Sequence, residues 1–597
     1  MINCDIVIVD SGLNLNENMA VPGVYIQRNG EEFVFCEDLT DMIGHGTIIY
    51  SVISKQVKNA KFFIVKLPEA QNNYDESCLI EALKYIKNNI NCKIINMSLG
   101  VKAGDRIKEL YNLCKEISST GVVVISAFDN DGSNSYPAAF ECVIGVDSKK
   151  NIKQTDEFEF VENSKINVLA KGNVQRLVTP DGRVLLVSGS SIACAHISSF
   201  LANAMIDDMN IQNSLLFLRS KAKYIHYSTK KEIDEKNKYF SIDNAIVFPF
   251  SKEAHAFLRF SDMLPFKIHK FYDVRYSGKV GRKLTSYYEN AKSESVISDV
   301  EKIDFTDIDT IILGHLDEIN AILGRDYRAE LIRKAISSHV NIYSFDPLDL
   351  YTDLLRNSEI KYFYPIVTQT DVPQNSFGKL YNISKPVVGI FGTSSQQGKF
   401  SLQLALKRGL ELEGYSVGTI GTEPHSLLFD FDAIFPMGYN STVRLLNSEI
   451  VLYLNSVINE LCLRGKEVIL VSTQAQIVPY SGNNLLEIPI MQYHFAIGTR
   501  PDAIVMCVNY YDEIGYIKNS VYALSGLTDA SIIAFVLFPV TYSNDLNIGY
   551  GSIKRIITDE EFTQKKKELQ NEFQLPVYIL GDVNHMHRLC KEIIDFF

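Results

Sequence analysis

The chain has 597 residues, of which 46% are hydrophobic and 22% are charged, and its formal net charge is −12. This length is too great for one hydrophobic core and predicts two to four domains. The composition is that of an ordinary globular protein, and the acidic balance argues against a general nucleic-acid-binding function. We therefore expect no nucleic-acid partner.

The ten cysteines form no CxxC pair and lie mostly in apolar runs, which predicts buried, reduced thiols. The opening MINCDIVIVDSG has no basic segment before an apolar stretch, so no signal peptide is predicted. No run approaches the roughly 18 apolar residues of a membrane span. We expect a cytoplasmic protein with no membrane partner.

Up to residue 245, short β-branched runs alternate with segments of helical spacing. The runs predict buried strands at residues 6–9, 62–65, 93–96 and 122–126. The helical spacing predicts helices at 79–88, 106–119, 193–207 and 211–223. Alternation of this kind is typical of a parallel sheet with crossover helices. The polar stretch 228–238 then suggests a domain boundary.

The remainder of the chain predicts two further α/β regions. In the first, a strand at 310–313 and a helix–strand pair at 331–337 and 340–345 indicate a Rossmann-like domain, and the turn-rich stretch 365–382 indicates a linker. In the second, a strand at 385–391 runs into a glycine loop and a helix at 401–413. We predict an α/β chain with domains at 1–245, 246–380 and 381–597.

Three polar residues stand where the first domain can bring them together. Asp10 ends the first strand in VDSG, His45 lies in GHGT, and Ser191 lies in SGSSIA at the start of an apolar helix. A helix N-terminus favours negative charge, as an oxyanion requires. The order Asp, His, Ser is one of the known orders of the hydrolytic triad.

These segments resemble the subtilisin-like serine peptidases, whose motifs are D-[ST]-G, H-G-T, S-L-G, A-G-N-x-G and G-T-S-M-A. The resemblance implies a subtilisin-like parallel-sheet domain over residues 1–245 and a serine endopeptidase activity. Ser191 would attack a carbonyl, His45 would take its proton, and Asp10 would orient the imidazole. Proteolysis of this type needs no cofactor, and we identify no metal site.

The same resemblance assigns the other site residues. Asn130 is the candidate oxyanion donor, and Ser98, Leu99 and Gly100 would bind the substrate backbone as an added strand. Phe128 is expected near the substrate pocket.

The sequence departs from the subtilisin pattern at two places. Asp129 stands where the family has a glycine, and Ala195 stands where a proline is usual. A subtilisin fold that binds peptide without cutting it therefore remains an alternative. His196 lies outside the motifs, and we interpret it as a packing residue.

A second motif, GTSSQQGKFS, occupies residues 392–401 between a strand and a helix. Backbone N–H groups of such a loop cradle phosphates, which makes five residues candidate nucleotide ligands. These candidates are Gly392, Thr393, Gly398, Lys399 and Ser401. We expect ATP or GTP with Mg²⁺ here.

The spacing resembles the dethiobiotin-synthetase-like branch of P-loop proteins and, more closely, the domain of unknown function 1611. Phe400 takes the usual magnesium-ligand position, and no carboxylate follows the strand at 468–471. The alternative is a degenerate loop that is kept for packing.

From residue 245 onward the chain also resembles clostridial peptide maturation proteins, on the segment VFPFSKEAHAFLRF, the GHLDEI turn and the glycine loop. The implied function is removal of the leader from a ribosomally synthesised precursor peptide, with peptide-modifying enzymes as further partners. One alternative is a nucleotide-dependent peptide-modifying or regulatory NTPase in which the peptidase fold only docks peptide. Another is a quality-control protease gated by nucleotide.

Overall fold

The structure is a computed structural model, and it describes fourteen segments of the chain. They are residues 1–16, 20–29, 32–68, 76–101, 104–130, 133–162, 164–206, 213–227, 239–288, 295–356, 358–373, 378–480, 488–542 and 554–597. Residues 1–230 with 373–384 form one compact unit, here the N-terminal unit. Residues 231–372 with 385–597 form the C-terminal unit. The predicted division into three domains stays a prediction.

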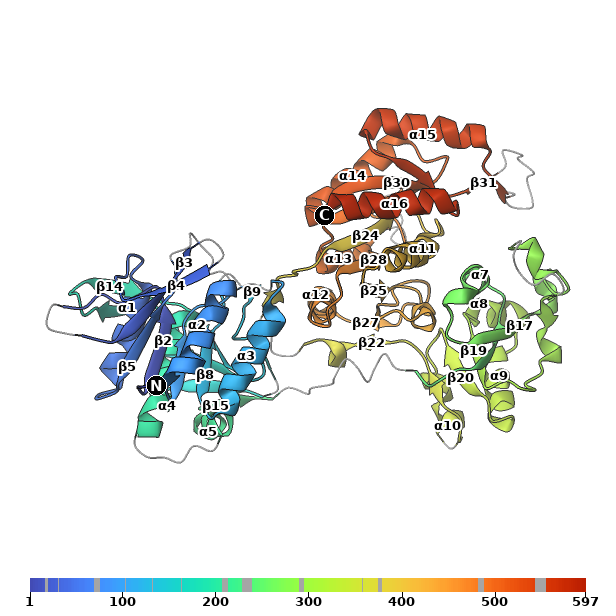
Figure 1. Cartoon of the computed structure of the whole chain (residues 1–597). Coiled ribbons are helices and arrows are strands. Elements are labelled where there is room, and N and C mark those ends of the chain that lie inside the picture. The colour runs from blue at the N-terminus through green and yellow to red at the C-terminus, as the bar shows by residue number, and fades with distance from the viewer. Residues whose placement is uncertain are drawn as a thin grey trace. The chain divides into compact units, whose positions relative to one another are not determined.

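The N-terminal unit is built on a ten-stranded sheet in which most neighbouring strands run parallel (Figure 1). In spatial order its strands are β15 (Tyr224–His226), β11 (Phe158–Val161), β12 (Val168–Lys171), β10 (Ile144–Lys149), β8 (Val123–Ala127), β7 (Ile94–Met97), β2 (Ile6–Asp10), β5 (Phe62–Lys66), β3 (Gly23–Asn29) and β4 (Glu32–Cys36). Only β3–β4 and β11–β12 pair antiparallel.

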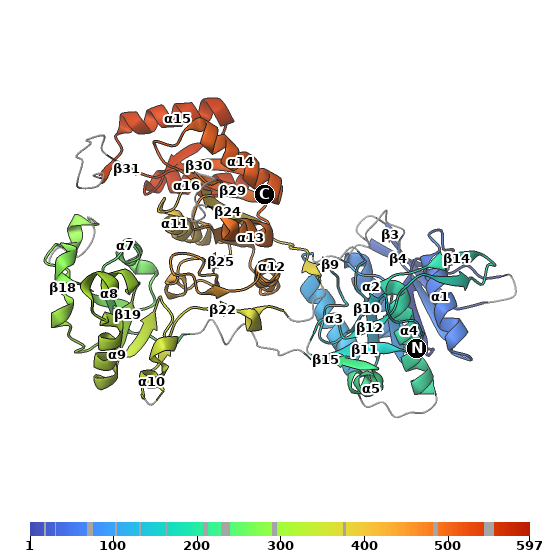
Figure 2. The same cartoon turned by 180° about the vertical axis from the view of Figure 1, so that it is seen from behind.

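Helices cover both faces of this sheet (Figures 1 and 2). They are α1 (His45–Gln56) and α4 (Ser190–Ile206) on one face, and α2 (Glu76–Asn89) and α3 (Ile107–Ser119) on the other. Strand β2 explains why: Ile6 and Ile8 join the core under α1 and α4, whereas Val7 and Val9 join the core under α2 and α3. A strand that is apolar at every position must be buried on both faces.

Several short elements complete the N-terminal unit. They are β1 (Ile2–Asn3), β6 (Ile90–Asn91), β9 (Ser133–Asn134), β13 (Gln175–Val178), β14 (Val184–Val187), α5 (Ser214–Lys221) and β23 (Leu380–Tyr381). The last of these lies in the stretch that the sequence predicts to be a linker. Instead of only connecting domains, it pairs in parallel with β9.

The C-terminal unit contains two large parallel sheets, in agreement with the predicted α/β class. The first has the order β18 (Ser298–Asp299), β17 (Lys267–Asp273), β16 (Asn244–Phe248), β19 (Thr310–Leu313), β20 (Asn341–Ser344) and β21 (Tyr362–Phe363). Its helices are α7 (Ala254–Arg259), α8 (Asp317–Leu323), α9 (Tyr327–Ser337) and α10 (Thr352–Leu355).

The second sheet has β24 at its centre, and the glycine loop follows that strand. Its order is β26 (Ala433–Ile434), β25 (Val417–Gly421), β28 (Val468–Ser472), β24 (Val387–Gly392), β29 (Ala503–Val508), β30 (Ser531–Leu537) and β33 (Val577–Ile579). Its helices are α11 (Lys399–Leu412), α12 (Asn447–Leu463), α13 (Ile490–Thr499), α14 (Ile514–Thr528), α15 (Asp559–Phe573) and α16 (Val583–Phe596). None of the helices in the described segments combines the length and the apolar character that a bilayer crossing requires.

Candidate functional site

Asp10 and His45 are in direct contact. Asp10 is the last residue of β2 and is fully buried, and His45 is the first residue of α1. The Nδ1 atom of His45 lies 2.7 Å from Oδ1 of Asp10. Gly46 permits this approach, because a Cβ there would lie 2.2 Å from the carbonyl oxygen of Gly12. The two glycine-containing motifs thus let two distant segments meet.

A second carboxylate, which the sequence analysis did not identify, fixes the start of α1. Oδ1 of Asp41 accepts hydrogen bonds from the Gly44 N–H at 2.7 Å and the Ser11 hydroxyl at 2.8 Å, and Oδ2 accepts from the Thr47 N–H at 2.8 Å. Asp41 therefore satisfies N–H groups at the helix N-terminus and ties the helix to the loop after β2. The only sequence feature that could have identified Asp41 is its position shortly before the histidine motif.

The two carboxylates determine the protonation of His45. Burial acts to lower the pKa of the imidazole, but Asp10, and next Asp41, outweigh it, so the pKa of His45 lies above its ordinary value. The side chain is still 34% exposed. In the part of the chain that the structure describes, Nε2 of His45 has no hydrogen-bond partner. This nitrogen is the one that a general base would use.

Ser191 lies in the first turn of α4 and is held against the segment that follows β7. Its hydroxyl donates to the carbonyl oxygen of Ser98 at 2.9 Å, and the Ser98 hydroxyl donates to the carbonyl oxygen of Ser191 at 3.0 Å. The structure thus brings Asp10 and His45 into contact but gives the Ser191 hydroxyl a partner other than His45. The assignment of the three residues as a triad stays a prediction.

Asn130 is oriented by the start of α4. Its side-chain Oδ1 accepts from the N–H of Ser190 at 2.9 Å and from the Ser190 hydroxyl at 3.0 Å. Gly189 has a φ of 121°, and a Cβ there would lie 3.0 Å from Oδ1 of Asn130, so a side chain at residue 189 would push the amide away. With Oδ1 engaged, the Nδ2 group of Asn130 remains available as a donor.

The other predicted substrate residues divide into two groups. Ser98, Leu99 and Gly100 follow β7 directly, as a peptide-pairing segment requires. Phe128 is only 1% exposed and packs in the core, so its side chain does not line an open pocket.

His196 is also buried, and it hydrogen-bonds the side-chain amides of Gln56 and Gln175. Burial lowers the pKa of His196 to about 4, which suits a neutral packing residue.

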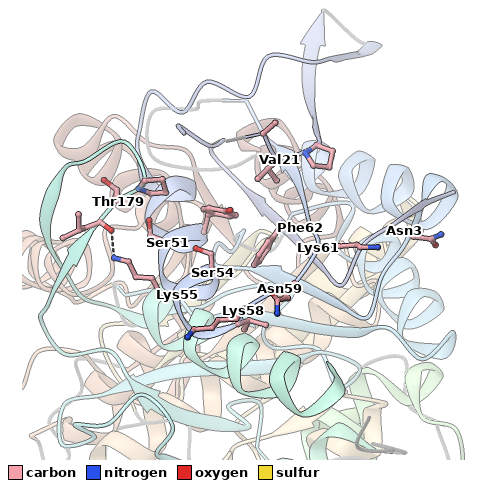
Figure 3. Close-up of a pocket in the computed structure, with 17 residues that line it drawn as sticks. Asn3, Val21, Ser51, Ser54, Lys55, Lys58, Asn59, Lys61, Phe62 and Thr179 are labelled. Atoms are coloured by element: carbon pink, nitrogen blue, oxygen red, sulfur yellow. Dashed lines mark hydrogen bonds between the residues drawn. The ribbon is translucent and has the colours of Figure 1, made fainter. Parts of the chain in front are cut away.

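A cavity of about 790 Å³ lies at the end of α1 that is remote from His45 (Figure 3). It is lined by residues from α1, from the loop between α1 and β5, and from the end of β13. These include Ser51, Ser54, Lys55, Lys58, Lys61, Phe62 and Thr179. None of the candidate catalytic residues lines this cavity, so it is not the predicted substrate site.

The glycine loop in the C-terminal unit is closed by its own side chains. Gln397 is 1% exposed, accepts from the Ser394 N–H at 3.0 Å and donates to the Thr393 hydroxyl at 2.6 Å. Lys399 is 5% exposed, and its ammonium donates to the Ser394 carbonyl at 2.6 Å. Burial lowers the pKa of Lys399 to about 8.

The structure explains the two departures of this loop from the usual pattern. The Phe400 ring packs 4.6 Å from the His425 ring, measured between ring centroids, and so belongs to an aromatic cluster. A carboxylate that contacts the loop is Asp512, which follows β29 rather than β28 and accepts from the Thr393 hydroxyl. Ser401 lies in the first turn of α11. No group of three or more metal-ligating His, Cys, Asp or Glu side chains occurs within the described ranges.

Comparisons with known proteins match both halves of the chain. Residues 10–235 match the subtilase family, and residues 376–582 match the domain of unknown function DUF1611_C, a P-loop domain. Proteinase T from Parengyodontium album is 29% identical over 176 residues, which cover 27% of this chain and 57% of that protein. The chain therefore spans little more than half the length of this relative.

Two solved structures also match. The prenylagaramide maturation protease PagA shares 19% identity with a TM-score of 0.26, covering 34% of this chain and 77% of that one. A DUF1611 family protein from Anabaena variabilis shares 12% identity with a TM-score of 0.42, covering 60% of this chain and all of the other. From the two family matches, the chain carries a subtilase domain in its N-terminal part and a DUF1611 P-loop domain in its C-terminal part, as its motifs predicted.

Proposed function

We propose that the N-terminal unit is a serine endopeptidase that removes the leader from a ribosomally synthesised precursor peptide. The observation that carries the peptidase activity is the 2.7 Å contact between Asp10 and His45, together with the motif serine in the first turn of α4. The leader-peptide substrate rests on the resemblance of the C-terminal half to peptide maturation proteins. Peptide-modifying enzymes are the proposed partners, and the cytoplasm is the proposed compartment.

The proposed mechanism assigns one task to each group. Ser191 rotates its hydroxyl from the Ser98 carbonyl toward Nε2 of His45, which takes the proton as Oγ attacks the scissile carbonyl. Asp10 keeps the proton of the imidazole on Nδ1 and stabilises the imidazolium that forms. The oxyanion accepts hydrogen bonds from Nδ2 of Asn130 and from the backbone N–H of Ser191. His45 then delivers its proton to the leaving amine.

The test is active-site labelling with a fluorophosphonate, followed by incubation with the precursor peptide encoded nearby. We expect wild-type protein to be labelled and to cut at one site, and Ser191→Ala to do neither. Ser199→Ala is the matched control, because this serine lies on the same helix and donates to the Ala195 carbonyl. Equal cutting by wild type and Ser191→Ala would end the proposal.

We also propose that the loop 392–401 binds the phosphates of ATP or GTP. The buried ammonium of Lys399 fits an anion at this place, because its only hydrogen-bond partner in the described chain is a backbone carbonyl. A bound nucleotide would supply the phosphates; Lys399, the loop N–H groups and the start of α11 would hold them. If Mg²⁺ accompanies the nucleotide, the Thr393 and Ser401 hydroxyls are the candidates to ligate it.

The hydrogen bond from Ser191 to Ser98 favours one alternative, in which the N-terminal unit docks peptide and the C-terminal unit is a nucleotide-dependent modifying or regulatory NTPase. Two variants distinguish this alternative from the peptidase. If Lys399→Ala abolishes product formation and Ser191→Ala does not, the alternative is correct. The opposite result supports the peptidase.

A further inference from the structure

The peptidase fold is completed by a segment from beyond the middle of the chain. Residues 373–384 belong to the N-terminal unit, although the chain on both sides of them belongs to the C-terminal unit. Within this segment Leu380 and Tyr381 pair with Ser133 and Asn134, so that β23 extends β9. The subtilase family match ends at residue 235 and does not include this segment.

Lys379, just before β23, is buried inside the N-terminal unit and is only 6% exposed. Its ammonium donates to the carbonyl oxygen of Asp129 at 2.6 Å and lies 3.5 Å from Oδ2 of Asp147. The Asn134 side chain donates to the Lys379 carbonyl at 3.4 Å. A buried ammonium is costly unless it is paired and hydrogen-bonded, and here the carboxylate of Asp147 supplies the opposite charge.

The carbonyl that Lys379 holds belongs to the peptide bond between Asp129 and Asn130. Because a peptide unit is planar, fixing this oxygen also fixes the plane that contains the Cα of Asn130, the atom from which its side chain projects. The other end of Asn130 is fixed by Ser190, which donates to Oδ1. The direction of Nδ2, the proposed oxyanion donor, is therefore determined by one contact from the start of α4 and one from residue 379.

We propose that Lys379 is a positioning residue for the oxyanion hole, so that the segment joining the two units is part of the catalytic machinery. The inference rests on the proposed peptidase function. Lys379 touches no substrate atom; it acts by holding the Asp129–Asn130 peptide unit. After β23 the same stretch of chain continues into β24 and the loop 392–401, so the C-terminal unit is joined to the oxyanion loop through a short connection.

The first test compares Lys379→Met with wild type in the full chain. Methionine keeps most of the side-chain volume but cannot donate a hydrogen bond. Since an error of about 1 Å in a catalytic group costs up to roughly 100-fold, we expect kcat to fall about 10- to 100-fold with KM nearly unchanged. Lys379→Arg should recover part of the loss. Lys149→Met is the matched control, because it removes an ion pair with Glu159 from the same sheet.

Two further measurements separate positioning from stability. A peptide boronate forms a tetrahedral adduct that uses the oxyanion hole, whereas the amine-side product peptide, which carries no new carboxylate, does not. We expect Lys379→Met to weaken the boronate in proportion to kcat and to leave product affinity unchanged. In a double-mutant cycle, Lys379→Met should lower kcat very little in the Asn130→Ala background, because the donor that it positions is already absent. If the methionine variant does not fold, Lys379→Leu, which also lacks a donor, replaces it in both measurements.

The outcomes distinguish this inference from the proposed function. If wild type and Lys149→Met cut the peptide, and the rate of Lys379→Met is within twofold of the wild-type rate, only the inference fails. Equal weakening of boronate and product, or full additivity with Asn130→Ala, also overturns it. If wild type neither cuts peptide nor binds the boronate, the proposed function fails and the inference fails with it.

Discussion

Two candidate sites in this chain, one built from the starts of α1 and α4 and the other at the start of α11, differ in how their polar groups are used. In the first, Nε2 of His45 and Nδ2 of Asn130 have no partners in the described segments. Around α11, Gln397 and Lys399 bond to the loop itself. In the first site the basic nitrogen and the amide donor are unoccupied and only the Ser191 hydroxyl has to leave an internal partner, whereas the second site must break several internal bonds before a ligand can bind.

The largest expected effect comes from removing the charge beside His45. Asp10→Asn should lower kcat by about 10⁴-fold, because the amide cannot hold the imidazole in the productive tautomer or stabilise its charged form. Steady-state cleavage of the precursor peptide measures this, with circular dichroism as the check on folding. A loss below tenfold in a folded variant would mean that the Asp10–His45 contact is structural.

The second effect concerns the free amide of Asn130. Asn130→Ala should lower kcat by about 10²- to 10³-fold while KM changes little, because the donor acts on the transition state. The same peptide assay measures kcat and KM of the variant and of wild type. An equal change in kcat and in peptide affinity would show that Asn130 binds substrate rather than the oxyanion.

The third effect tests the loop around α11. The pKa of Lys399 is lowered to about 8 in the free protein, and a phosphate bound beside it must raise this pKa. Binding therefore requires the protonated lysine, so affinity for ATP or GTP is constant below pH 8 and falls about tenfold per unit above it. Calorimetric titration from pH 7 to 9.5 measures this. Lys399→Arg should remove the fall, and affinity that rises above pH 8 would contradict it.

A smaller effect should follow from opening the same loop. Gln397→Ala removes the hydrogen bond from the Ser394 N–H that a phosphate would have to displace, and at about 1 kcal/mol net for this bond the affinity should rise about threefold to tenfold. Calorimetric titration of both proteins measures the ratio of their nucleotide affinities. Weaker binding by Gln397→Ala would mean instead that the glutamine contacts the nucleotide, and the contrast between the two sites would disappear.

The smallest effect is a change in pH dependence. His45 must be neutral to act as a base, and its pKa is raised by Asp10 and Asp41, so the acid limb of kcat/KM should have its midpoint above 6.5. Asp41→Asn removes one of these charges and should move the midpoint to lower pH. A midpoint that stays in place or rises would show that Asp41 acts only by capping α1.

Much of this arrangement could be predicted because it is local in the sequence. VDSG and GHGT each place a polar side chain at the end of an apolar segment, and GTSSQQGKFS lies between a strand and a helix as its pattern requires. The partners that come from elsewhere could not be predicted. Asp512 follows a different strand from the expected one, and Lys379 lies in a stretch whose composition indicates only turns.

The pairing of β23 with β9 has a consequence for how this protein can be divided. Any recombination or engineering step that separates the two halves near residue 245 would strip the first half of Lys379, Leu380 and Tyr381. A transplanted subtilase half would then keep every recognisable motif and still lack the buried Lys379 ammonium that holds the Asp129 carbonyl. The first half is therefore not one continuous stretch of sequence, and a variant that contains it must also include residues 378–384.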